Sequence, residues 1–270
     1  MSNINYELEF LFGRWYERII QNGGKNITKD GIMFQNDKTD EQVEKEWKAS
    51  PKRVVILLKD QHQFGDGEKW NENINLWLKD IDWENTVERD KWNAKAAFNR
   101  DLKSKFLRNI AYILWGLIKI DKNNDWWYGQ VEMHHEEVKK LFNTQPFALV
   151  ECKKEPGGGK LEDKILRQHL DDYGDLLRKE IDVLNPNMIV CTNGIIYDFV
   201  LNMYPEDELT KIEGQHNSIR YHRKTDTFIF CSYHPSASNY GKLTDEDIYE
   251  GVMCHYRAFL QFEYASEFLK

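Results

Sequence analysis

The chain has 270 residues, of which 41% are hydrophobic and 30% are charged, and its formal net charge is −8. This balance is typical of a soluble globular protein, and its acidic sign argues against nucleic-acid binding driven by charge over the whole surface. No run approaches the roughly 18 apolar residues of a membrane span, and the first residues lack the basic and apolar pattern of a leader peptide.

The N-terminal part is expected to hold a helix, a buried strand and an unusual aromatic segment. Apolar residues at helical spacing predict a helix over residues 5–20, whereas residues 24–50 are polar and suit a loop or a short helix. An apolar, β-branched run predicts the first core strand at residues 53–58. Residues 65–97 place four tryptophans among many charges, which indicates an inserted lid or a surface subdomain. Its indoles either attach the segment to the core or stack on nucleic-acid bases.

The rest of the chain alternates between predicted helices and strands. Further strands are expected at residues 147–152, 188–192 and 227–231, the last in a hairpin with residues 219–222. Helices are expected at residues 98–120, 161–184, 195–203 and 244–268. This order predicts a mostly parallel four-stranded sheet flanked by helices, in a single domain over residues 1–270 with its core at about 50–265.

Two strand ends that are far apart in the sequence carry dense polar groups. Lys59-Asp60-Gln61-His62 follows the first strand, and Tyr233-His234-Pro235-Ser236 follows the last. Since parallel sheets place ligands beyond the carboxyl ends of their strands, both groups are expected to border one crevice. Asp60 could orient or deprotonate a water there, and His234 could donate a hydrogen bond to a leaving group. Taken singly, each residue also suits a structural role in a turn or a helix cap.

A basic loop is predicted after the second strand. Residues 153–160 read Lys-Lys-Glu-Pro-Gly-Gly-Gly-Lys, and such a loop can offer backbone N–H groups and a lysine to a phosphate. The loop lacks the GxxxxGK[ST] pattern of a P-loop. Lysine-rich loops are also common as plain solvated surface, and the sequence leaves both interpretations open.

Together these motifs resemble those of the uracil-DNA glycosylase superfamily, over roughly residues 50–260. His234-Pro235-Ser236 matches the last motif of that family intact, and Asp60 falls where some branches carry the Asp of Gly-Gln-Asp-Pro-Tyr. The first motif lacks its Gly and Pro here, and the iron–sulfur cysteines of some branches are missing. The resemblance implies an α/β protein, a three-layer α/β/α sandwich with a central four-stranded, mostly parallel sheet.

The resemblance also implies a role for the polar residues at the strand ends. Asp60 would position the attacking water, and His234 would hydrogen-bond the carbonyl oxygen of a base that is flipped into the pocket. The base pocket would be lined by Gln61, His62, Glu151 and Asn193. DNA phosphates would be bound by Gly157, Gly158, Gly159, Lys160 and Ser236.

Glu151 departs from the family at a position that reads the base. The superfamily usually has an Asn at the end of its second strand, whose amide complements uracil, and we place Glu151 there. A carboxylate matches an exocyclic amino group better than a carbonyl group. Uracil itself is therefore not expected to be the preferred base.

The leading functional hypothesis is a DNA glycosylase that hydrolyses the N-glycosidic bond of uracil or another modified or damaged base in single- or double-stranded DNA. The negative charge and the altered first motif favour an alternative, a non-catalytic module that binds nucleic acid or a nucleotide. A hydrolase of a small nucleoside or nucleotide is a third hypothesis. Because the four cysteines are scattered without a CxxC pair, we expect reduced thiols in the cytoplasm, no metal site and no cofactor.

Overall fold

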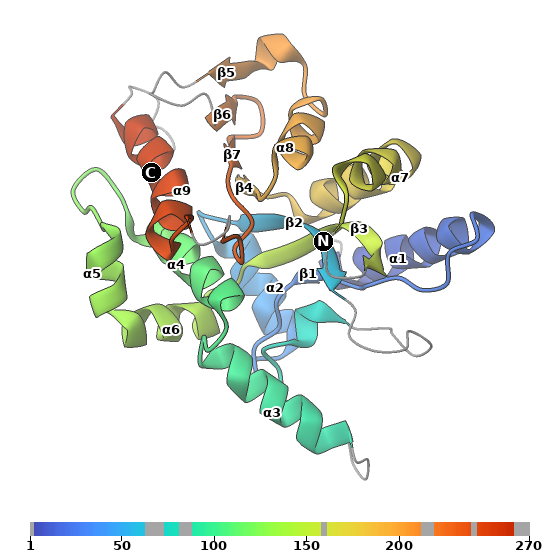
Figure 1. The fold of residues 1–270 in the computed structure, drawn as a ribbon, viewed down its shortest axis with the longest axis horizontal. Coiled ribbons are helices and arrows are strands. Elements are labelled where there is room, and N and C mark those ends of the chain that lie inside the picture. Colours follow the sequence, from blue (N-terminus) through green and yellow to red (C-terminus); the bar gives the residue numbers. More distant parts are fainter. Residues whose placement is uncertain are drawn as a thin grey trace.

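A mixed β-sheet forms the centre of the fold (Figure 1). The computed structural model describes residues 3–62, 73–80, 88–157, 161–211, 219–238 and 242–261. Its strands are β1 (Gly31–Ile32), β2 (Val54–His62), β3 (Ala148–Gly157), β4 (Met188–Cys191), β5 (Leu209–Lys211), β6 (Ile219–His222) and β7 (Thr227–Cys231). They lie in the order β1-β3-β2-β4-β7-β6-β5, and the middle four are parallel neighbours. The predicted four-stranded parallel core is confirmed, and antiparallel strands extend it at both edges.

Helices cover both faces of this sheet, so the fold has three layers (Figure 1). One face packs against α1 (Ile4–Gln21), α2 (Asp40–Ala49), α7 (Asp163–Leu184) and α8 (Gly194–Leu201). The other face packs against α4 (Lys105–Lys119), α5 (Tyr128–Met133), α6 (His135–Thr144) and α9 (Asp245–Leu260). The remaining helices of the described residues are α3 (Glu88–Arg100), which contacts α6, and the short 3₁₀ turns Ile74–Leu76 and Glu206–Glu208. The α/β sandwich is confirmed.

The parallel strands are apolar on both faces because helices cover both. Along β2, Val54, Ile56 and Leu58 pack in the core with α4 and α9, whereas Val55 and Leu57 pack in the core with α1 and α7. All five side chains are buried. A strand that is covered on both sides has no solvent-facing positions, which explains the continuous apolar run that predicted it.

The prediction of one helix over residues 98–120 is wrong. α3 ends at Arg100 and α4 begins at Lys105. Ser104 is the N-cap of α4, and its side-chain oxygen accepts a hydrogen bond from the backbone N–H of Leu107 at 3.2 Å. Leu102, between the two helices, has a φ of 54°, in the left-handed region that a right-handed helix does not use. Its side chain is buried in the core. The helix is therefore interrupted where Leu102 packs into the core, and the apolar periodicity of the sequence did not reveal this interruption.

Residues 24–50 were expected to form a loop or a short helix and residues 153–160 a loop, and both segments contain regular structure. Residues 24–50 include β1 and α2, and α2 begins with a capping box between Thr39 and Gln42. Residues 153–157 continue β3 beside a lengthened β2, because the paired strands satisfy each other's backbone groups. The last helix was predicted to residue 268, whereas α9 ends at Leu260 and residues 262–270 lie outside the described part.

Part of the tryptophan-rich segment packs against the core. Ile74 and Leu78 are buried, and Trp77 packs on the cluster that contains α4 and α9. Outside the described part lie Trp70, Trp83 and the side chain of Trp92. In residues 73–80, the apolar side chains attach the segment to the core, which is the simpler of the two roles expected for its indoles.

Candidate functional site

The carboxyl ends of β2 and β3 bring several polar side chains to one face of the sheet. Leu58 pairs with Glu151 and Asp60 pairs with Lys153 in parallel register. Because side chains alternate along a strand, these four residues lie on the same face, which α4 and α9 cover. Two carboxyl groups and an ammonium group therefore gather where a buried strand pair ends.

Gly157 lies directly against the carboxylate of Asp60. It is the last residue of β3, where it pairs with His62. A Cβ atom at Gly157 would lie 1.8 Å from Oδ2 of Asp60, so the carboxylate occupies space that only a glycine leaves open. The structure thus gives Gly157 a role that the sequence did not predict. Its neighbours Gly158, Gly159 and Lys160 lie outside the described residues.

His234 follows β7 and contacts an aromatic wall. Its ring stacks on Phe106 at the start of α4 with 5.7 Å between centroids, and Phe106 meets Trp77 edge-on at 6.5 Å. The backbone N–H of Ser236 donates to Nδ1 of His234 at 3.2 Å, and Oγ of Ser236 lies 2.9 Å from the same nitrogen. A ring nitrogen that accepts from a backbone N–H carries no proton, so neutral His234 holds its proton on Nε2.

The surroundings of His234 keep it uncharged. Burial of the ring, together with the positive charge of Lys59, lowers the pKa of His234 to about 4. Lys59 belongs to the carboxyl end of β2 and forms an ion pair with Asp163 at 3.0 Å. At neutral pH, His234 is therefore a neutral donor through Nε2, which has no hydrogen-bond partner among the residues that the structure describes.

Asp60 and His234 both lie at the carboxyl end of the parallel strands. β2 and β7 are both parallel neighbours of β4, so their carboxyl ends lie on either side of the end of β4.

Asn193 follows β4, and its Oδ1 accepts from the backbone N–H of Ile195 at 2.8 Å. This bond makes Asn193 the N-cap of α8. Gln61 and His62 belong to β2 through their backbone, and their side chains lie outside the described part.

Glu151 is a buried acid beside Asp60. Glu151 is only 2% exposed, and its Oε2 has no hydrogen-bond partner among the described residues. Its backbone N–H donates to Oδ2 of Asp30 at 2.7 Å. Burial, reinforced by the negative charges of Asp30 and Asp60, raises the pKa of Glu151 well above that of an ordinary glutamate. These surroundings therefore oppose the ionisation of Glu151.

On the opposite face of the sheet, β3 carries a buried lysine, Lys154, three residues after Glu151. Lys154 is fully buried, and its Nζ forms ion pairs with Oδ2 of Asp30 at 2.5 Å and Oε1 of Glu180 at 2.9 Å. Its ammonium also lies 5.7 Å from the ring centre of Trp15. The interpretation of residues 153–160 as a solvated basic loop is wrong at Lys154. Pairing with two acids that are distant in sequence makes the burial of this lysine tolerable.

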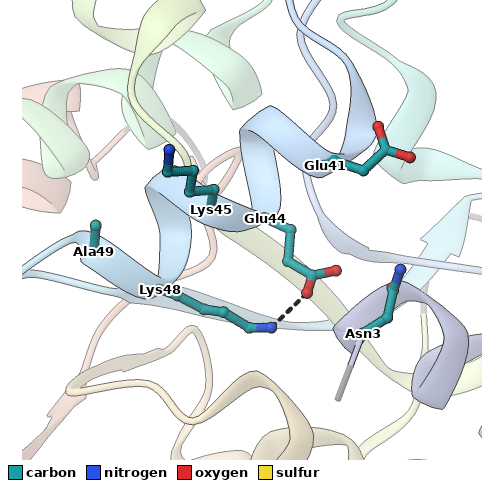
Figure 2. A pocket seen from close by; sticks show the side chains of 6 residues that line it. All are labelled: Asn3, Glu41, Glu44, Lys45, Lys48 and Ala49. Atoms are coloured by element: carbon teal, nitrogen blue, oxygen red, sulfur yellow. Dashed lines mark hydrogen bonds and ion pairs between the residues drawn. The ribbon is translucent and has the colours of Figure 1, made fainter. Parts of the chain in front are cut away.

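A surface pocket of about 380 Å³ lies elsewhere, between α2 and the start of α1 (Figure 2). It is lined by Asn3, Glu41, Glu44, Lys45, Lys48 and Ala49. Glu44 and Lys48 pair with each other at 2.5 Å across one turn of α2. Because α2 leads into the amino end of β2, this pocket is remote from the strand ends that carry Asp60 and His234.

Two further features of the described residues concern membranes and metals. No helix in this part of the chain combines the length and the apolar character that crossing a bilayer requires. The described His, Cys, Asp and Glu side chains form no group of three or more that could hold a metal ion.

The family comparison agrees with this arrangement. The family model "Uracil DNA glycosylase superfamily" matches residues 83–252, which is more than half of the chain. The matched range contains Glu151, Asn193 and His234, whereas Asp60 lies before it. A search of curated proteins found no match. The three-layer sandwich, the neutral histidine at the end of β7 and the family match lead to one conclusion: the chain belongs to the uracil DNA glycosylase superfamily.

Proposed function

We propose that the protein is a DNA glycosylase that hydrolyses the N-glycosidic bond of uracil or another modified or damaged base. The observation that carries this proposal is the neutral His234, whose Nε2–H donor lies at the same edge of the sheet as the carboxylate of Asp60. Membership in the superfamily supports it. The protein would act as a single domain on DNA in the cytoplasm.

The two groups suit the two halves of a hydrolysis. As the glycosidic bond breaks, negative charge accumulates on the leaving base, and a fixed N–H donor such as His234 stabilises it through a carbonyl oxygen. The sugar carbon becomes electron-poor, and Asp60 orients or deprotonates the water that attacks it. The target nucleotide must leave the stack to reach both groups. Ser236 is exposed beside His234 and, with Gly158, Gly159 and Lys160, is proposed to contact DNA phosphates.

A second candidate function is a non-catalytic module that binds nucleic acid or a nucleotide. The net charge of −8 and the altered motif around Asp60 favour it. The family match begins after β2, so it gives no support to this motif. The two candidates differ in whether abasic sites form.

A panel of DNA substrates separates these functions. Single- and double-stranded oligonucleotides carrying uracil, hypoxanthine, xanthine or modified cytosines are incubated with the wild type and with the double variant Asp60→Asn/His234→Ala. Alkali then cleaves the DNA at abasic sites. Cleavage with the wild type alone supports a glycosylase and identifies its base. Tight DNA binding without cleavage supports the binding module, and the absence of both points to a hydrolase of small nucleosides or nucleotides.

Replacing Gly157 with alanine tests the contact with Asp60. The new Cβ would overlap the carboxylate, which must move, while the backbone of β3 keeps its pairing. A displacement of about 1 Å at a reacting group lowers rates by about 100-fold, so we expect a loss of this size in single-turnover excision. The matched control is Gly129→Ala in α5, where a Cβ meets nothing within 4 Å. Equal rates for the two variants would contradict a role for the position of Asp60.

A further inference from the structure

A single peptide group connects His234 to the interior of the protein. The backbone N–H of Ser236 donates to Nδ1 of His234 at 3.2 Å. The carbonyl oxygen of Pro235, on the same peptide group, accepts a hydrogen bond from Nδ2 of Asn109 at 2.7 Å. This peptide group is trans and planar, so its N–H and its C=O point in opposite directions. Holding the oxygen therefore also fixes the direction of the N–H that reaches His234.

Asn109 approaches this peptide group from inside the protein. It belongs to α4 and is only 1% exposed. Its Nδ2 also donates to Oδ1 of Asp245, the first residue of α9, at 3.2 Å. Two acceptors on this side oblige the amide to present its NH₂ group there, because Oδ1 of Asn109 would be repelled by both. The side chain therefore acts, among the described residues, as a donor to these two groups.

Asp245 holds the side of α4 that faces the loop after β7. Its carboxylate forms ion pairs with Lys105 at 3.2 Å and with Arg108 at 3.0 Å. Burial raises the pKa of this carboxyl, but hydrogen bonds from Arg108, Asn109 and Lys105 outweigh the burial and lower the pKa below the ordinary value. Nζ of Lys105 also donates to the carbonyl oxygen of Ala237 at 2.9 Å. One ionised carboxylate thus holds two side chains that each bind a carbonyl group of this loop.

The direction of the Ser236 N–H decides where His234 holds its proton. A backbone N–H can only donate, so Nδ1 of His234 must stay unprotonated opposite it. The hydroxyl of Ser236 lies 2.9 Å from the same nitrogen, but a hydroxyl can donate or accept and therefore adapts to either tautomer. Donation to the oxygen of a peptide group also polarises its N–H, which strengthens the bond to Nδ1. The peptide group is therefore the contact that keeps the proton on Nε2.

We propose that Asn109 is a positioning residue, which sets the tautomer and the direction of His234 through the peptide group between Pro235 and Ser236. This inference rests on the proposed glycosylase function, in which Nε2–H of His234 donates to the leaving base. Because Asn109 is buried behind the loop, it does not touch the substrate and acts only through the histidine.

Nitrogen NMR of the His234 ring tests this inference without a DNA substrate. In the wild type at neutral pH, Nδ1 should show the chemical shift of an unprotonated nitrogen and Nε2 that of a protonated one. Asn109→Leu removes both hydrogen bonds of the amide at a similar volume, so the two tautomers should become mixed. The matched control is Asn187→Leu, in a buried asparagine before β4 whose amide donates to the carbonyl oxygen of Pro51, and it should keep the wild-type shifts.

Two outcomes of the NMR comparison overturn the inference. One is a wild type whose His234 carries its proton on Nδ1, and this measurement needs no variant, so it remains decisive if Asn109→Leu folds poorly. The other is a folded Asn109→Leu whose ring shifts equal those of the wild type.

Single-turnover kinetics on a substrate found with the DNA panel add a functional readout. Asn109→Leu should lower the maximal excision rate by about 10- to 100-fold, the effect of a reacting group displaced by about 1 Å, and should leave the affinity for DNA unchanged. In the background of His234→Ala, the same substitution should cause no further loss, because its effect passes through the histidine. An equal loss with and without His234 would show a general structural role and overturn the inference. A wild type that excises no base overturns the proposed function itself, whereas the NMR comparison still decides the role of Asn109.

Discussion

Replacing His234 with alanine is expected to lower base excision by about 100- to 1,000-fold, the effect of removing one fixed donor to a developing anion. The Nδ1 side of the ring is held by Ser236, so only Nε2–H can point to the leaving base. Single-turnover kinetics on a substrate found with the DNA panel measure this loss. His134→Ala, in a histidine that packs on Trp126 toward the other end of α4, is the matched control and should leave the rate unchanged.

The pH dependence of the wild type tests the same assignment. Because the pKa of His234 is lowered to about 4, from an ordinary value of 6.5, the imidazole stays neutral throughout the usual assay range. The rate contributed by His234 should therefore persist as the pH falls through 6.5 and decline only near 4. A decline centred between pH 6 and 7 that His234→Ala abolishes would show that the histidine works in its charged form instead.

Replacing Lys154 with methionine is expected to lower the free energy of unfolding by about 3–5 kcal/mol. Methionine fills a similar volume but leaves Asp30 and Glu180 as buried acids without their shared cation. Urea unfolding at neutral pH, followed by circular dichroism, measures the change. Lys164→Met, in an exposed lysine of α7, is the control and should change stability by less than about 0.5 kcal/mol. A small loss in Lys154→Met would mean that water reaches the two acids.

The sign of the pH effect on stability follows from the same cluster. Burial, together with the charge of Asp30, raises the pKa of Glu180 well above the usual glutamate value. A glutamate whose pKa is higher in the folded state binds a proton on folding, so its contribution is fully present below the unfolded pKa and is lost as the pH rises. Glu151 acts in the same direction. Partial recovery of Lys154→Met in acid, where the two acids are protonated, would agree with this reasoning.

The sequence was sufficient to predict the architecture and the placement of Asp60 and His234 at the carboxyl ends of the parallel strands. Runs such as residues 54–58 and 228–231 are continuously apolar, as expected of strands that helices cover on both faces, and all four parallel strands were predicted. Parallel strands end at one edge, so the placement of Asp60 and His234 together followed from the order of the elements. The strands and their order could be predicted because hydrophobic patterning and chain order can be read directly from the sequence.

Other features depend on contacts between segments that are distant in the sequence. Lys154 has the composition of a surface loop, yet the pleat of β3 turns it toward Asp30 and Glu180, which lie 124 and 26 residues away. Glu151 is an ordinary acid in the sequence, and only its burial beside Asp30 and Asp60 raises its pKa. The sequence by itself therefore determined the layers, the strands and the end of the sheet at which the candidate residues Asp60 and His234 lie. The tertiary structure alone decided which charges are buried and which groups hold protons, because solvation and charge proximity are properties of the packed chain.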